Sequence, residues 1–261
     1  MRFLGADWNG TVIPNGKWMT SLGSAADEKD QKVWRYLTFS RFVWLLQRRQ
    51  LWLARADTLD DRWEIALAGD QLAYVISRHP PTTLPLSGDR QESAMERVQR
   101  IIPMWRQKTF VSCWNCSEDE SHALWRVYCG AIEGVAFQST LGRLRNSAAP
   151  LPVLPIEYGA PGSKRQTPTP IDLATQKRRT FAYEQEVRIV QTYIGDDATA
   201  PPDEALGRCL EWEPETYIDS IWVHPDAAPS FMETVAATVK QYAPILEDRI
   251  EWSAMRGRPP A

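Results

Sequence analysis

Short runs in which apolar and polar residues alternate dominate the second half of the chain, whereas apolar residues at helical spacing dominate the first half. Alternation is typical of half-buried strands, and an apolar residue at every third or fourth position is typical of amphipathic helices. The pattern predicts strands at residues 33–37, 51–55, 109–114, 134–139, 186–194, 208–212, 218–223 and 249–253. It predicts helices at residues 41–50, 62–77, 90–107, 122–128, 141–145, 171–180 and 227–242. We therefore expect an α+β fold, with helices flanking a mixed, mostly antiparallel sheet.

The same pattern divides the chain unevenly. Residues 1–30 are rich in Gly, Asn, Ser and Asp and lack periodicity, which indicates a flexible N-terminal arm. Residues 31–256 are expected to form a single domain that carries a helical insertion at about 62–107. No internal repeat divides this domain further.

Composition narrows the class of protein. The 261 residues are 43% hydrophobic, which excludes disordered and collagen-like chains, and four cysteines are too few for a disulfide scaffold. A net charge of −3 excludes a generally basic nucleic-acid coat, although a local basic groove is compatible with it. The chain has no run of about 18 apolar residues and no signal-peptide pattern at its start, so we expect a cytoplasmic protein without membrane contact.

Common nucleotide and metal motifs are missing. The sequence contains neither GxGxxG nor GxxxxGK[ST], so a Rossmann cofactor site and a P-loop are not expected. Cys113 and Cys116 form a single CxxC motif without a second pair of ligands. Core thiols are the simpler interpretation of these cysteines, and we expect no metal.

The segment FAYEQEVRIV, residues 181–190, holds the densest candidate chemistry. Glu184 and Glu186 alternate at the entry to an apolar strand, which would place both carboxylates on one face about 7 Å apart, and Arg188 continues that face. Such a pair can stabilise an oxocarbenium-like transition state at a ribose while one carboxylate orients the nucleophile. A structural lattice of ion pairs is the alternative interpretation.

Arg35 on an early strand, Ser112 on a later one and then Glu-x-Glu follow the chain order of the R-S-E class of ADP-ribosyltransferases, which this sequence resembles. The resemblance implies an ADP-ribosyltransferase-like fold, with a split sheet, and an enzyme that uses NAD as cosubstrate. It implies that Arg35 holds the NAD diphosphate, that Tyr36 or Ser112 shapes the nicotinamide pocket, and that Glu186 acts at the ribose while Glu184 orients the acceptor. Arg55 and Arg188 complete the expected cofactor-binding set.

A longer resemblance, followed through residues 34–64, 110–137, 183–190, 218–235 and 250–256, is to the bacterial family known as domain of unknown function 2971. That resemblance implies membership of a family without an established activity. Its implied functional residues are Asp61, Trp114, Trp125, Tyr128, Glu184, Glu186 and Arg188.

Three functions remain open from the sequence. The first is an NAD-using ADP-ribosyltransferase-like enzyme, a toxin or phage-defence effector, acting on an unidentified nucleotide or macromolecular acceptor. The second is a non-catalytic module that binds nucleic acid, through basic runs such as 143–145, 163–165 and 177–179, or a partner protein of a defence system. The third is a nuclease that holds Mg²⁺ with Asp61, Glu184 and Glu186.

Overall fold

The computed structural model describes residues 27–61, 63, 65–67, 71–73, 93–130, 132–159, 169–193, 201, 202 and 204–257. The α-helices are α1 (Phe39–Arg48), α3 (Ala94–Gln107), α4 (His122–Tyr128), α5 (Leu141–Ala148), α6 (Pro170–Ala174), α7 (Pro214–Tyr217) and α8 (Pro229–Tyr242). Short 3-10 helices are η1 (Asp27–Asp30), η2 (Ala56–Thr58), η3 (Arg179–Glu184) and η4 (Pro244–Arg249). The expected N-terminal arm lies outside the described residues up to position 26.

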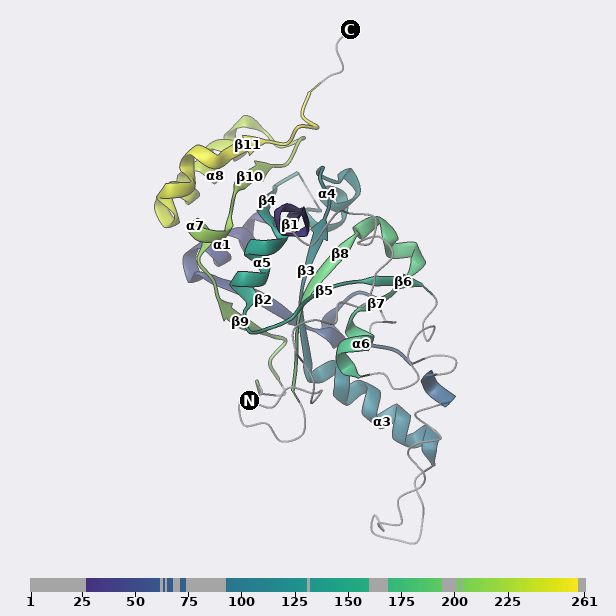
Figure 1. The fold of residues 1–261 in the computed structure, drawn as a ribbon. Helices are drawn as coiled ribbons and strands as arrows, with labels where there is room; N and C mark the ends of the chain where they lie inside the picture. Colours follow the sequence, from purple (N-terminus) through teal and green to yellow (C-terminus); the bar gives the residue numbers. More distant parts are fainter. Residues whose placement is uncertain are drawn as a thin grey trace.

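Strands make up the centre of the described fold (Figure 1). They are β1 (Lys32–Thr38), β2 (Gln50–Arg55), β3 (Thr109–Cys116), β4 (Gly134–Thr140), β5 (Val153–Pro155), β6 (Glu157–Gly159), β7 (Gln176–Arg178), β8 (Glu186–Thr192), β9 (Gly207–Glu211), β10 (Ser220–Val223) and β11 (Ile250–Trp252). Nine of them form one sheet in the order β11-β10-β4-β1-β3-β2-β9, with β8 pairing β3 and β5. Within that sheet only β10 and β11 pair in parallel, so the predicted mixed, mostly antiparallel α+β fold is confirmed.

The sheet is split at β3. One end of β3 pairs with β1, where Trp34 is opposite Asn115, and the other end pairs with β2, where Ala54 is opposite Val111. Both β1 and β2 lie on the same side of β3, because β8 occupies the other side over its whole length. The middle of β3, residues 112–114, therefore has no strand partner on that side.

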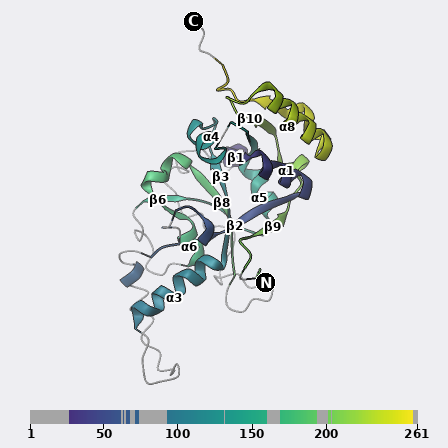
Figure 2. The same cartoon turned by 180° about the vertical axis from the view of Figure 1, so that it is seen from behind.

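Helices cover the two faces of the sheet unequally, as Figures 1 and 2 show from opposite sides. On one face, α1, α5 and α8 bury their apolar residues in the main core, which includes Phe42, Leu144 and Val235. The other face carries two smaller apolar clusters. One lies under α4 around Trp125, and the other lies under α6 around Leu173.

Several helix boundaries follow from the sequence, and one segment does not. Ser93 and Glu96 form a capping box at the start of α3, and α8 confirms the predicted helix at 227–242. The predicted helix at 171–180 is wrong, because the chain forms the short α6, then β7 in parallel pairing with β6, then η3. Of the predicted helix at 62–77, residues 71–73 are helical, whereas residues 63 and 65–67 are not, and the remainder lies outside the described residues. No described helix has the length and apolar character needed to cross a bilayer.

Candidate functional site

The gap in the sheet is filled by Arg35. Its guanidinium donates a hydrogen bond to the carbonyl oxygen of Cys113, which has no strand partner on that side, and lies 5.8 Å from the centre of the Trp114 ring. Burial lowers the pKa of Arg35, although neighbouring Cys113 and Tyr128 act in the opposite sense. An arginine side chain remains protonated even when it is buried, so the gap in the sheet holds a fixed positive charge.

The two glutamates meet at a corner rather than along a strand. Glu184 is the last residue of η3, Glu186 is the first residue of β8, and Gln185 between them has a left-handed backbone with φ of 41°. The expectation that both carboxylates alternate on one strand is therefore wrong. The left-handed residue turns the chain between them, and both side chains still reach the same lysine.

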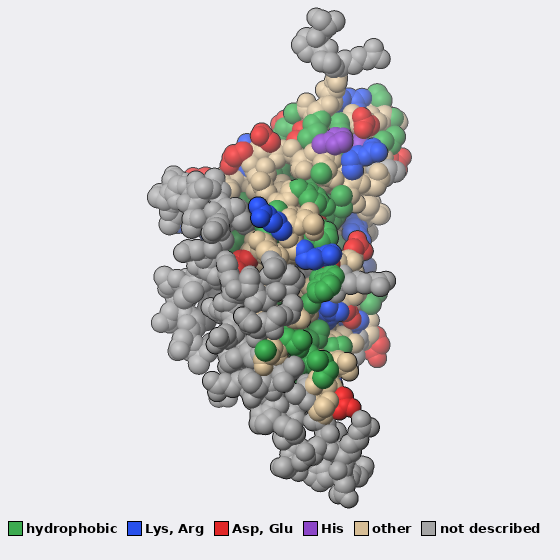
Figure 3. Space-filling view, turned by 90° about the vertical axis from the view of Figure 1, so that its right-hand side faces the viewer, with side chains coloured by type: hydrophobic (Ala, Val, Ile, Leu, Met, Phe, Trp, Pro, Cys, Tyr) green, Lys and Arg blue, Asp and Glu red, His purple; other side chains and the backbone are tan. Residues whose placement is uncertain are grey.

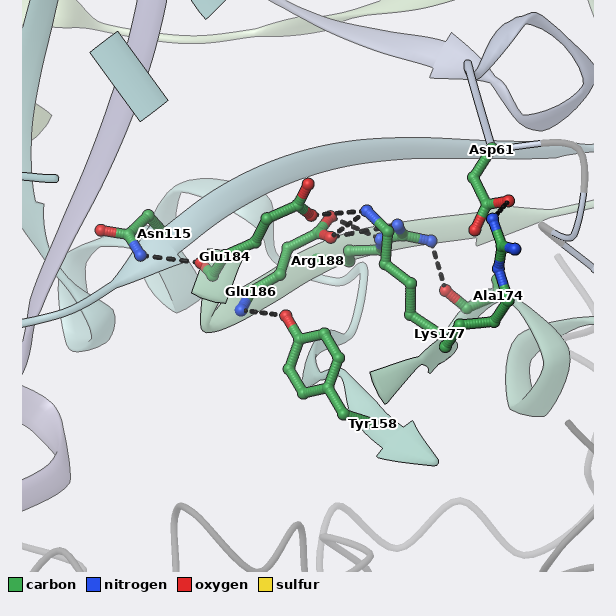
Figure 4. Close-up of polar contacts among 9 residues, drawn as sticks. Asp61, Asn115, Tyr158, Ala174, Lys177, Glu184, Glu186 and Arg188 are labelled. Atoms are coloured by element: carbon green, nitrogen blue, oxygen red, sulfur yellow. Dashed lines mark hydrogen bonds and ion pairs between the residues drawn. The ribbon is translucent and has the colours of Figure 1, made fainter. Parts of the chain in front are cut away.

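That lysine is Lys177 of β7, and with Glu184, Glu186 and Arg188 it forms what we call the charged cluster (Figure 4). The Lys177 Nζ atom lies 2.5 Å from Oε2 of Glu184 and 3.3 Å from Oε2 of Glu186. Arg188 donates to both oxygens of Glu186, with Nε 2.6 Å from Oε1 and Nη2 3.1 Å from Oε2. All four side chains are more than nine-tenths buried, so these ion pairs are shielded from solvent.

The two carboxyl groups differ in their proton affinity. Burial opposes ionisation of Glu186, but the charges of Arg188 and Lys177 outweigh it and hold its pKa at about 2, against an ordinary 4.5. Burial raises the pKa of Glu184, and Lys177 compensates only in part. The pKa values of Glu184 and Glu186 are thus shifted in opposite directions. This pattern is common where one carboxyl group must stay ionised while the other exchanges a proton.

Backbone and side-chain hydrogen bonds fix the cluster from three sides. Asn115 donates from Nδ2 to the Glu184 carbonyl at 2.7 Å, and the Glu186 backbone N–H donates to the Tyr158 hydroxyl at 2.7 Å. Arg188 donates from Nη1 to the Ala174 carbonyl at 2.8 Å. The cluster is therefore held by β3, β6 and α6 as well as by its own ion pairs, as Figure 4 shows.

Cys113 connects Arg35 to the charged cluster. It faces Arg188 in the β3–β8 register, and its thiol interacts with the Glu186 carboxylate while its carbonyl accepts from Arg35. Cys113 and Arg35 are half-buried, and Tyr128, at the end of α4, is 38% exposed. The pKa of Tyr128 is raised by burial and by neighbouring Cys113, Glu184 and Glu186, which places its hydroxyl in the same electrostatic environment.

The other expected cofactor-binding residues are not brought to this group. Ser112 is fully buried on the opposite face of β3, where its hydroxyl accepts from Trp114 Nε1 at 3.2 Å. Tyr36 packs edge-on against Trp125, and its hydroxyl accepts from the Ser121 backbone at 2.7 Å. Ser112 faces the main core, because alternate residues of a strand face opposite sides of a sheet. Tyr36 is instead packed against α4, where Trp125 contacts its ring and the Ser121 backbone its hydroxyl.

Arg55 lies at the far end of the sheet gap. It is opposite Phe110, whereas Glu186 is opposite Asn115, so about 17 Å of strand separates the two positions along β3. The Arg55 Nε atom pairs with Asp57 Oδ1 at 2.7 Å. This arginine does not take part in the same site as Arg35.

Three further residues implied by the family resemblance lie outside the charged cluster. Trp114 and Trp125 are fully buried in separate apolar clusters. Asp61 pairs with Arg178 at 2.8 Å, and Figure 4 shows it on the far side of Lys177 from Glu184. Within the described ranges no three His, Cys, Asp or Glu side chains are grouped to hold a metal, and Cys113 and Cys116 point to opposite faces of β3.

Lys177, Cys113 and Tyr158 were missed as site residues. Lys177 belongs to the basic run 177–179, which the sequence offers as a nucleic-acid contact, and it lies on β7, a strand that pairs with β6. No local signal marks such a position. Cys113 adjoins the predicted Ser112 and could have been found by asking which β3 residue shares a face with Arg188.

Comparison with models of protein families, with curated proteins and with solved structures returned no match to this chain.

Proposed function

We propose that the chain is an NAD-using ADP-ribosyltransferase-like enzyme whose site lies at the split in the sheet. The observation that carries the proposal is that Arg35 of β1 donates to the Cys113 carbonyl of β3, whereas the Cys113 side chain lies opposite Arg188, which binds Glu186 in β8. The Arg35 guanidinium, which would bind the diphosphate, and the Glu186 carboxylate, which would act at the ribose, therefore lie close to the same residue.

The charge balance supports an anionic ligand. The positive charges of Lys177 and Arg188 balance the negative charges of Glu184 and Glu186. The positive charge of Arg35 is therefore not balanced within the cluster. In the described part of the chain no carboxylate forms an ion pair with Arg35. A guanidinium fork matches the oxygens of a phosphate in two-point contact, so a diphosphate is a suitable partner.

In the proposed reaction the bond between nicotinamide and ribose C1′ breaks, and its electron pair leaves with nicotinamide. Glu186, ionised throughout the physiological range, stabilises the oxocarbenium that remains. The acceptor or water then forms the new bond at C1′, and Glu184, whose raised pKa suits proton exchange, accepts its proton. Tyr128 offers an exposed ring beside these groups.

A second candidate is a non-catalytic binding module. Both oxygens of Glu186 accept from Arg188, and Lys177 contacts one of them, which is what a purely structural ion-pair lattice requires. Its partner would be a protein of a defence system or a nucleic acid. On the face in Figure 3 the basic side chains are interspersed with acidic and hydrophobic ones, which is an unfavourable surface for a nucleic acid.

The test is incubation of the protein with NAD labelled in the nicotinamide and in the adenylate, with and without cell extract. We expect nicotinamide release by the wild type and loss of release in Glu186→Gln. Arg35→Met should weaken NAD binding in calorimetry by roughly tenfold to a hundredfold, because a charge-assisted hydrogen bond is removed.

Arg143→Met is the matched control, since Arg143 pairs with Asp219 on the surface and does not contact the cluster. Absence of both turnover and NAD binding in the wild type would reject the enzyme and leave the binding module.

A further inference from the structure

We propose that Cys113 is a positioning residue that holds Glu186 and Arg35 in a fixed relation, its side chain acting on the carboxylate and its backbone on the guanidinium. The expected effect of Cys113 on NAD turnover rests on the proposed function, whereas its contacts with Glu186 and Arg35 do not.

The position of Cys113 in the sheet allows this double role. It sits in the middle of β3, between the residues that pair with β1 and those that pair with β2. Cys113 is opposite Arg188 of β8, and the two side chains lie on the same face of the sheet. The Cys113 carbonyl points into the gap that Arg35 fills.

The chemistry of the thiol suits a donor rather than a nucleophile. Burial, and then the negative charge of Glu186, raise the pKa of Cys113 to about 12. The thiol is therefore protonated at neutral pH, the form that can donate to the neighbouring carboxylate, while the thiolate that attacks electrophiles is scarce. Arg188, Lys177 and this thiol together favour the ionised form of Glu186.

Thiol alkylation tests the contact without NAD. The rate for Cys113 with iodoacetamide is followed by peptide mass spectrometry across pH, with half-buried Cys209 as the internal reference. Glu186→Gln should lower the apparent pKa of Cys113 and speed its labelling about tenfold at neutral pH, because a charge that disfavours the thiolate is removed. The rate at Cys209 should not change.

Glu211→Gln is the matched control, because Glu211 raises the pKa of Cys209 just as Glu186 raises that of Cys113. It should speed labelling of Cys209 and leave Cys113 unchanged. Faster labelling of buried Cys116 and Cys129 in Glu186→Gln would reveal unfolding as the cause and overturn the inference, as would an unchanged Cys113 profile.

NAD turnover tests the consequence. Cys113→Ala should reduce kcat for nicotinamide release about tenfold, with the KM for NAD within about twofold, and should move the acidic limb of the pH profile upward. Cys113→Ser, which keeps a donor, should recover most of the loss. Equal kinetics for wild type and Cys113→Ala would overturn the positioning role, whereas a wild type without turnover would reject the proposed function and leave the alkylation result to decide the contact.

Discussion

Arg188 holds Glu186 by two roughly parallel hydrogen bonds, 2.6 Å and 3.1 Å long, from neighbouring nitrogens of one guanidinium to the two oxygens of one carboxylate. Both residues belong to β8 and are two positions apart, so the pair forms within a single strand. Each is nearly inaccessible to solvent, which makes the loss of either partner costly.

Removal of Arg188 should therefore destabilise the fold strongly. We expect Arg188→Met to lower the free energy of unfolding by about 3–5 kcal/mol, measured by urea denaturation, because Glu186 stays buried with one cation fewer. The double variant Glu186→Met with Arg188→Met should regain most of this loss, since it removes the unpaired charge. A single variant that loses less than about 1 kcal/mol would contradict this account.

Glu184 and Glu186 should affect the free energy of unfolding in different pH ranges, which meet at about pH 4.5. The pKa of Glu186 is lowered to about 2 on folding, so its contribution is complete above pH 4.5 and is lost as the pH falls toward 2. The pKa of Glu184 is raised, so its ionisation weakens the fold as the pH rises above 4.5.

Urea midpoints measured across pH will separate the two effects. Glu186→Gln should flatten the loss of stability below pH 4.5, and Glu184→Gln should abolish a decline above it. The prediction fails if both variants change the same pH interval.

Ser112 should matter for stability and not for NAD. Ser112→Ala leaves the buried Trp114 indole N–H without its acceptor, which we expect to cost about 1–3 kcal/mol of unfolding free energy. NAD affinity in calorimetry should match that of the wild type, because the side chain faces the main core. A loss of affinity at unchanged stability would return Ser112 to the site.

Gln185 gives a test of backbone strain at the Glu-x-Glu corner. Its φ of 41° disfavours side chains branched at Cβ, so Gln185→Val should destabilise the protein by about 1–2 kcal/mol. Gln185→Gly removes the steric cost at this exposed position and should be neutral or stabilising by up to about 1 kcal/mol. The reverse order in thermal unfolding would exclude strain at this corner.

Local pattern was sufficient for much of the fold. The apolar repeats of α1 and α8 and the alternation in β3 and β8 specify these elements without reference to distant segments. The alternation also correctly placed Glu186 and Arg188 on one face.

The site depended on contacts that local pattern does not encode. Lys177 reaches Glu184 because a three-residue strand interrupts what reads as a helix. Gln185 adopts a left-handed conformation without being glycine, so the corner had no sequence signal. The split at β3 arises from pairing with two strands that are more than fifty residues away in the sequence, and Arg35 lies in the gap between them.

The buried charges on β8 also discriminate against an error of alignment. A shift of β8 by one residue against β3 would turn Glu186 and Arg188 toward the aromatic interior around Trp114 and expose Val187 and Ile189 on the polar side. Lys177 would lose both acceptors at once. A purely apolar strand would tolerate such slippage far better, so the same charges that form the proposed site also penalise every pairing of β8 except the native one.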